Sequence, residues 1–148
     1  MATIKLYTIG FTGKSAQQFF ELLEQNGVRK IIDTRISNAS QLSGFAKGRD
    51  LAFFARRLAD IDYEHELDFA PTKELLDDYR QKQISWAAYT EIYLQLLENR
   101  PIKANVDTSA LHQSCLLCSE HSPEKCHRRL LAEYLQTINP EIEIIHLR

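Results

Sequence analysis

The chain has 148 residues, 44% of them hydrophobic and 26% charged, a composition typical of one globular domain with a single core. Its formal net charge of -2 argues against a basic surface over the whole protein, of the kind that binds nucleic acids or anionic membranes, but leaves room for a local basic pocket. No apolar run approaches the ~20 residues of a membrane-spanning helix, and the N-terminus lacks the charged-then-apolar layout of a signal peptide, so we expect a cytoplasmic protein without membrane contact.

The first part of the chain predicts a strand, a helix and a second strand. Residues 4–9 are rich in β-branched and aromatic side chains and end at Gly10. A helix is expected next, because apolar residues recur at helical spacing: Ala16, Phe19, Phe20, Leu22 and Leu23. Gly27 suits the end of this helix, since it accepts a positive φ without a clash, and an apolar run over 28–32 then ends at Asp33. Two strands joined in this way are expected to be parallel.

The middle of the chain predicts a long loop, a helix and a third strand. Residues 36–48 are rich in Ser, Asn and Gly and exceed the usual length of a connection, which indicates a functional loop. Residues 49–59 are expected to form a helix whose core-facing side is made of Leu51, Phe54, Ala55 and Leu58. Residues 61–67 are the third predicted strand, although charged side chains are frequent there.

Two further helices are expected before the cysteine-rich part of the chain. The first starts at Pro71, and the second runs over 84–99 and ends before Pro101. The apolar side of the second helix is made of Trp86, Tyr89, Ile92, Tyr93 and Leu96. Residues 102–113 show no clear period and are expected to form a loop.

The end of the chain predicts a strand, a helix and a last strand. Residues 115–118 are a compact buried strand, and Ser122 with the Pro-Glu pair after it is typical of a helix start. That helix ends before Pro140, and residues 141–147 alternate as a strand. Together these elements predict an α/β fold in one domain over 1–148. We expect a three-layer sandwich, Rossmann-like or flavodoxin-like, with a mostly parallel sheet of about five strands.

Polar side chains gather where the predicted strands end. They are Thr8 and Gly10 after the first strand, Asp33 and Arg35 after the second, His65 after the third, and Cys118 and Glu120 after the fourth. The carboxyl ends of parallel strands meet at one edge of a sheet, and α/β sheets bind ligands in the crevice there. Each residue also has a structural interpretation, since Asp33 can pair with Arg35 and His65 can be a surface side chain. The set as a whole predicts a binding site.

The stretch CLLCSEHSPEKCHRR, residues 115–129, holds all three cysteines and could be a metal site or a reactive thiol. A zinc ion could be coordinated by four side chains of this stretch: Cys115, Cys118, Cys126 and His127. However, residues three apart on a strand lie roughly 10 Å apart and face opposite sides, so one ion cannot bind both Cys115 and Cys118. We therefore expect no metal. Because the number of cysteines is odd and no secretion signal is present, we expect free thiols in a reducing cytoplasm.

Cys126 is the candidate thiol nucleophile. We expect it in the first turn of the last helix, where amide groups and the helix dipole stabilise an anion. Positive charge around it adds to this effect, from Lys125, His127, Arg128 and Arg129. In the alternative interpretation Cys126 is a small core residue, because it lies four and eight residues before apolar residues of the same helix. Arg128 lies off that apolar side and is expected to reach the sheet edge.

Several blocks of the chain resemble the signature of the domain of unknown function 488 family. They are residues 7–10 (YTIG), 33–35 (DTR), 63–65 (YEH), 116–120 (LLCSE) and 126–128 (CHR), with Phe45, Leu67, Trp86, Tyr89 and Tyr93. The likeness extends from about Lys5 to Leu147 and implies a small cytoplasmic prokaryotic α/β protein, without an established reaction. The chain departs from the family at Phe11, often a His, at Ser37 and Asn38, near a usual Pro-Arg, and at Asp68 and Phe69, typically a Gly pair.

We expect a pocket at the C-terminal sheet edge that binds a small anionic molecule such as a nucleotide. Arg35 and Arg128 are the candidates for binding its phosphate or carboxylate. The other candidates for contact with the ligand are Thr8, Gly10, His65 and Cys118. The acid/base candidates are Asp33, Glu120 and His127, with Cys126 as nucleophile, for hydrolysis or group transfer. The sequence indicates no particular cofactor.

Two alternatives stay open. The first is a non-catalytic module that senses a nucleotide or docks nucleic acid through a local basic face made of Lys47, Arg49, Arg56 and Arg57. The second is a structural zinc protein.

Overall fold

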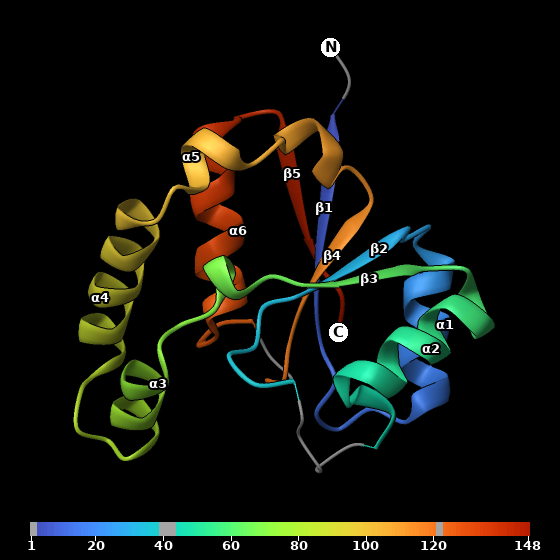
Figure 1. Cartoon of the computed structure of the whole chain (residues 1–148), viewed down its shortest axis with the longest axis horizontal. Coiled ribbons are helices and arrows are strands. Elements are labelled where there is room, and N and C mark those ends of the chain that lie inside the picture. Colours follow the sequence, from blue (N-terminus) through green and yellow to red (C-terminus); the bar gives the residue numbers. More distant parts are fainter. Residues whose placement is uncertain (1–2, 39–43, 121–122) are drawn as a thin grey trace.

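The computed structural model of the protein describes residues 3–38, 44–120 and 123–148. Five strands form one parallel sheet in the order β3-β2-β4-β1-β5 (Figure 1). The strands are β1 (Ile4–Gly10), β2 (Lys30–Asp33), β3 (Asp62–His65), β4 (Ser114–Cys118) and β5 (Ile142–His146). The α/β class and the parallel sheet of five strands that the sequence predicts are confirmed.

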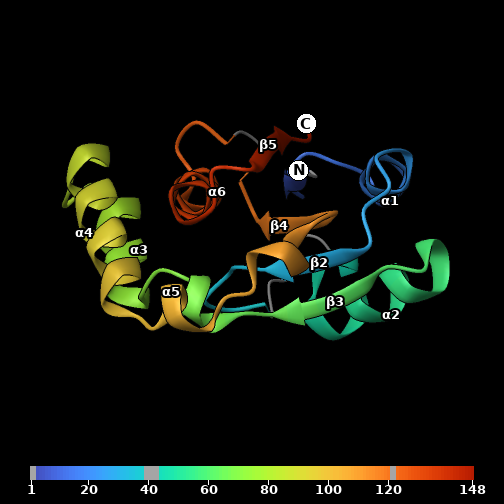
Figure 2. The same ribbon diagram turned by 90° about the horizontal axis from the view of Figure 1, so that it is seen from above.

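Helices cover both faces of the sheet, so the molecule is a three-layer sandwich (Figure 2). One face packs against α1 (Ala16–Gln25) and α2 (Gly48–Ala59). The other face packs against α6 (His127–Ile138), with α3 (Lys73–Arg80), α4 (Trp86–Asn99) and α5 (Ile102–Asn105) on the same side. Three short 3-10 turns complete the described chain: η1 (Gly44–Ala46), η2 (Leu67–Phe69) and η3 (Thr108–Leu111). No helix in the described ranges has the length and apolarity needed to cross a bilayer.

β4 is buried along its whole length and alternates between the two cores. Leu116 belongs to the cluster beneath α6, while Cys115 and Leu117 belong to the cluster beneath α1 and α2. Cys118 faces the α6 side, where it contacts Cys126. The prediction that Cys115 and Cys118 face opposite sides of the sheet is therefore confirmed.

The connections that leave the sheet change face around β4. The chain leaves β1 and β2 toward α1 and α2 on one face, and it leaves β4 toward α6 on the other face (Figures 1 and 2). Because β4 lies between β1 and β2, neighbouring connections diverge at its carboxyl end. A crevice at such a point is where open α/β sheets bind ligands.

Side-chain caps fix the starts of three helices. Ser15 and Gln18 form a reciprocal capping box at the start of α1. Thr72 caps α3 and Ser85 caps α4, each through a hydroxyl that accepts an N–H bond of 3.1 Å. These local signals explain why the predicted helix starts are accurate to within about two residues.

Three details of the predicted elements are wrong. Leu58 is 58% exposed, because the last turn of α2 extends beyond the core, with residues 56–58 all exposed. Ile92 is 48% exposed, because the buried side of α4 is the narrower row Tyr89, Tyr93 and Leu97. The predicted loop over 102–113 contains α5 and η3 instead.

The start of α6 also differs from its prediction. The helix begins at His127, and Cys126 is its N-cap rather than a residue of the first turn. The Cys126 N–H donates to the Pro123 carbonyl at 3.3 Å, so these residues form a separate turn before the helix. Ser122, the predicted cap, lies outside the described residues.

We predict that Gly10→Ala destabilises the fold, because a Cβ at Gly10 would overlap the Glu120 carbonyl and lie 2.8 Å from Arg128 Nη1. The free energy of unfolding, measured by urea titration, is expected to fall by at least about 2 kcal/mol. Gly44→Ala is the matched control, since a Cβ there meets no atom within 4 Å. Equal stability of the two variants would contradict the close approach of the chain at Gly10.

Candidate functional site

The residues predicted for a ligand site meet at the carboxyl edge of the sheet. The strand register places Gly10 beside Cys118, and Asp33 between Leu117 and His65. The remaining predicted residues lie on these strands, follow them closely or begin α6. One edge of the sheet therefore brings the predicted set together.

A pocket of about 470 Å³ opens at this edge, between the end of β4, α3, α4 and the start of α6. Half of the predicted site residues line it: Arg35, Cys118, Glu120, Cys126 and His127. The other half lie outside its lining. Four of them contact residues that form it, namely Gly10, Asp33, His65 and Arg128, and Thr8 contacts Arg128. The predicted site is thus a pocket wall supported by a second row of residues.

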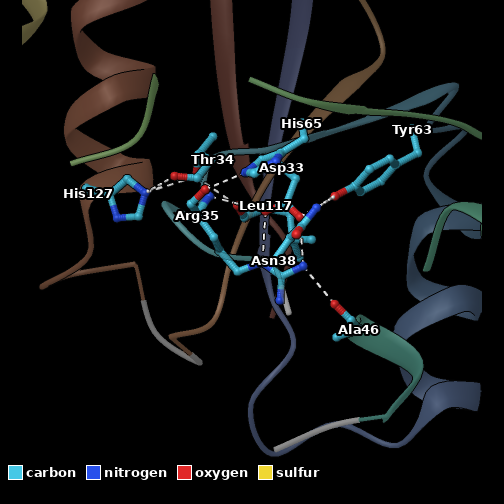
Figure 3. Close-up of polar contacts among 9 residues, drawn as sticks. All are labelled: Asp33, Thr34, Arg35, Asn38, Ala46, Tyr63, His65, Leu117 and His127. Carbon is cyan, nitrogen blue, oxygen red and sulfur yellow. Dashed lines mark hydrogen bonds and ion pairs between the residues drawn. The ribbon is translucent and has the colours of Figure 1, made fainter. Parts of the chain in front are cut away.

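Asp33 and Arg35 form a buried ion pair (Figure 3). Arg35 Nε donates to Asp33 Oδ1 at 2.9 Å, and Nη2 donates to Oδ2 at 2.7 Å. The Tyr63 hydroxyl also donates to Asp33, at 2.6 Å, and burial together with this bond raises the pKa of the phenol. Arg35 Nη2 donates in addition to the Ala46 carbonyl at 2.7 Å. The carboxylate of Asp33 is fully buried and directed at Arg35, so it positions the guanidinium instead of facing the pocket.

The rest of Arg35 is held from several sides. His65 Nε2 donates to the Arg35 carbonyl at 2.7 Å. The guanidinium carbon lies 5.1 Å from the ring centroid of Phe11. Among the described residues, Arg35 Nη1 is buried without a hydrogen-bond partner.

His127 is buried at the start of α6 and tied to β2 through Thr34 (Figure 3). Its Nε2 lies 2.9 Å from the Thr34 carbonyl and 3.0 Å from the Thr34 hydroxyl, and that hydroxyl donates to the Leu117 carbonyl. Since a carbonyl only accepts, Nε2 must carry the ring proton and Nδ1 the lone pair. Burial lowers the pKa of His127 to about 4, against the opposing effect of the Thr34 bond, so the ring is neutral at pH 7.

Arg128 reaches the sheet edge, as predicted, but it is fully buried there, although the sequence placed it off the apolar side of the helix. Its Nε donates to the Thr8 hydroxyl at 3.3 Å, and its Nη1 lies 3.0 Å from Cys118 Sγ and 2.5 Å from the Glu120 carbonyl. Burial lowers the pKa of Arg128 to about 10, which leaves it cationic at pH 7. These bonds are internal, so Arg128 anchors the residues that line the pocket.

The sulfur atoms of Cys118 and Cys126 are paired within the pocket wall. The expectation of three free thiols is therefore wrong, because the end of β4 and the N-cap of α6 bring two of them together. Cys115 is free and buried on the opposite face of the sheet, where burial raises its thiol pKa. In the described part of the chain, no group of three or more His, Cys, Asp or Glu side chains is placed to hold a metal ion.

Sequence reasoning missed part of the pocket wall. Arg80 and Tyr79 come from the end of α3, and Tyr89 comes from α4. The strand order brings α3 and α4 beside the end of β4, and no local pattern encodes that order. Tyr89 was part of a visible aromatic pattern, but its helical spacing assigned it to the core.

Comparison with known proteins gives the family. The model of a family described as Domain of unknown function DUF488 matches residues 15–135, which is most of the chain. This protein belongs to that family. The resemblance seen in the sequence blocks is therefore confirmed, and residues 33–35, 63–65, 116–120 and 126–128 lie within the matched range. No curated protein and no solved structure matched the chain.

The lowered pKa of His127 predicts a pH-dependent stability. As the pH falls from about 6.5 to about 4, the unfolded chain takes up a proton at this ring while the folded chain does not, so the stability from this group is lost over that window. Wild type is expected to lose about 3 kcal/mol more than His127→Gln between pH 7 and pH 4, measured by urea unfolding at each pH. Parallel pH profiles for the two proteins would contradict a buried neutral ring.

Proposed function

We propose that this protein acts in the cytoplasm and binds a small anionic molecule in the pocket at the carboxyl edge of its sheet. The observation that carries the proposal is the charge of the pocket wall. Arg80 and Lys125 are exposed there and Arg35 is the third cation, whereas Glu120 is the single acidic residue among the described lining residues. Since the whole chain has a net charge of -2, this positive excess is local and favours an anionic ligand.

The aromatic residues of the wall support a ligand with a flat ring, such as a nucleotide. The Tyr79 and Tyr89 rings line the pocket with centroids 5.2 Å apart. Trp86 stacks behind Tyr89, at 5.1 Å between centroids and 14° between planes. Tyr89 is only 2% exposed, so the half-buried Tyr79 is the ring on which a base would stack, and stacking tolerates many base identities. The pocket of about 470 Å³ is of the size typical for small ligands.

The reaction class that we propose is hydrolysis or group transfer. Cys126 in its reduced form supplies a nucleophile at the N-cap of α6, where the helix dipole favours a thiolate. Glu120 is exposed on the pocket wall and can exchange protons with water or a leaving group. His127 is neutral, with its Nε2 proton bonded to Thr34, so only its Nδ1 is available as an acceptor.

Binding can be tested by a thermal-shift screen of inorganic phosphate, nucleotides and sugar phosphates. A true ligand at ~100 times its dissociation constant adds about 2.7 kcal/mol of stability, or roughly 5–10 °C in Tm for a chain of this size. For the best ligand, the double variant Arg80→Ala/Lys125→Ala is expected to raise the dissociation constant by about tenfold, which corresponds to ~1.4 kcal/mol.

The control for this screen is Arg49→Ala, which removes an exposed cation from α2 on the other face of the sheet. It is expected to bind as wild type does. If no anion shifts the wild-type Tm, or if Arg49→Ala weakens binding as much as the double variant, the anionic ligand is the wrong class for this pocket.

Turnover distinguishes an enzyme from a non-catalytic sensor. We expect Cys126→Ser and Glu120→Gln to retain the ligand affinity while lowering turnover by about 10²-fold or more, because each removes a reacting group rather than a binding contact. The matched controls are Cys115→Ser, on the far face of the sheet, and Glu124→Gln, whose carboxyl is exposed and paired with Arg148. Unchanged turnover in both test variants would favour the sensor.

A further inference from the structure

Cys118 and Cys126 come from different elements and meet on the pocket wall. Cys118 ends β4, and Cys126 caps α6. Their side chains are almost fully buried, at 1% and 2% exposure, yet both line the pocket, which connects them to solvent. The two sulfur atoms are in contact across the pocket wall.

The surroundings of the pair favour thiolates. Arg128 Nη1 lies 3.0 Å from Cys118 Sγ, and the guanidinium is held in place by its bonds to Thr8 and Glu120. Cys126 precedes the first turn of the twelve-residue helix α6, where the helix dipole stabilises negative charge, and its side chain makes no capping bond. A cation beside one sulfur and a helix start beside the other are the conditions that make cysteines reactive.

We propose that Cys118 and Cys126 are a dithiol–disulfide couple that reduces small-molecule disulfides. One thiolate attacks a sulfur of the substrate R–S–S–R, forming a mixed disulfide and releasing one R–S⁻, which takes a proton. The second thiolate attacks the protein sulfur of that mixed disulfide and releases the second R–S⁻. The protein pair loses two electrons and two protons, and the substrate becomes two thiols. This activity goes beyond anion binding and does not depend on it.

Cys115 provides an internal control for this couple. It lies on the same strand as Cys118 but faces the opposite core, fully buried among apolar side chains. Burial raises the pKa of its thiol, so it stays protonated. A reagent that oxidises cysteines at random would not distinguish between these sites, whereas the proposed couple leaves Cys115 reduced.

The experiment uses the full chain, reduced and freed of reductant, then incubated with glutathione disulfide in the absence of nucleotides and phosphate. Released glutathione is quantified, and the protein is alkylated, digested and mapped by mass spectrometry. We expect two glutathione thiols per chain, a linked peptide pair containing Cys118 and Cys126, an alkylated Cys115, and full reversal by dithiothreitol.

The variants separate the two steps. Cys118→Ser and Cys126→Ser are each expected to stop at a mixed disulfide and to release one glutathione per chain, a twofold loss. Cys115→Ala is expected to release two, as wild type does. If this variant fails to fold, as judged by circular dichroism, the wild-type peptide map decides alone. Wild type that stops at a mixed disulfide, releases no glutathione or links Cys115 would overturn the proposal, while the anion screen would still stand.

Discussion

The buried guanidinium of Arg128 is the interaction on which the rest of the site depends. A charged group without access to water must have its N–H groups bonded within the protein. The bonds of Arg128 reach Thr8 on β1, Cys118 at the end of β4 and the carbonyl of Glu120 beyond it. The close approach of this last segment leaves no room for a side chain at Gly10. One charge therefore fixes two strands, the segment after β4 and the start of α6 relative to one another.

The pocket wall and the row behind it have different physical requirements. Behind the wall, Asp33 holds Arg35 and Thr34 holds His127, through bonds that water does not reach. A substitution in this row leaves a partner buried and unpaired, so it lowers stability and disturbs the pocket at the same time. Arg80 is exposed on the wall, and its side chain makes no hydrogen bond or ion pair with the residues that the structure describes. Substitution of an exposed wall residue such as Arg80 is therefore the better test of what the pocket binds, because it changes ligand binding without leaving a buried partner unpaired.

Much of the fold follows from local sequence patterns, and the part that does not is set by long-range pairing. Apolar runs, capping residues and glycines predict all five strands, and polar residues at the strand ends predict the edge at which the pocket lies. Strand order is encoded in no local pattern, so the contributions of Arg80 and Tyr89 to the pocket were not visible. The same holds for the meeting of Cys118 with Cys126, which requires the position of α6 against β4. Direct pairing of neighbours such as Asp33 with Arg35 was foreseeable.

β4 occupies the middle of the sheet in space, yet it is the fourth of five strands in the chain. β1 and β2 are joined through it, so neither can pair with it until residues 114–118 have been synthesised, after β1, β2 and β3. Until then a nascent chain carries open strand edges that other chains can pair with. Such distant pairing also makes assembly slow. Insertion of the central strand is therefore the step that closes these edges.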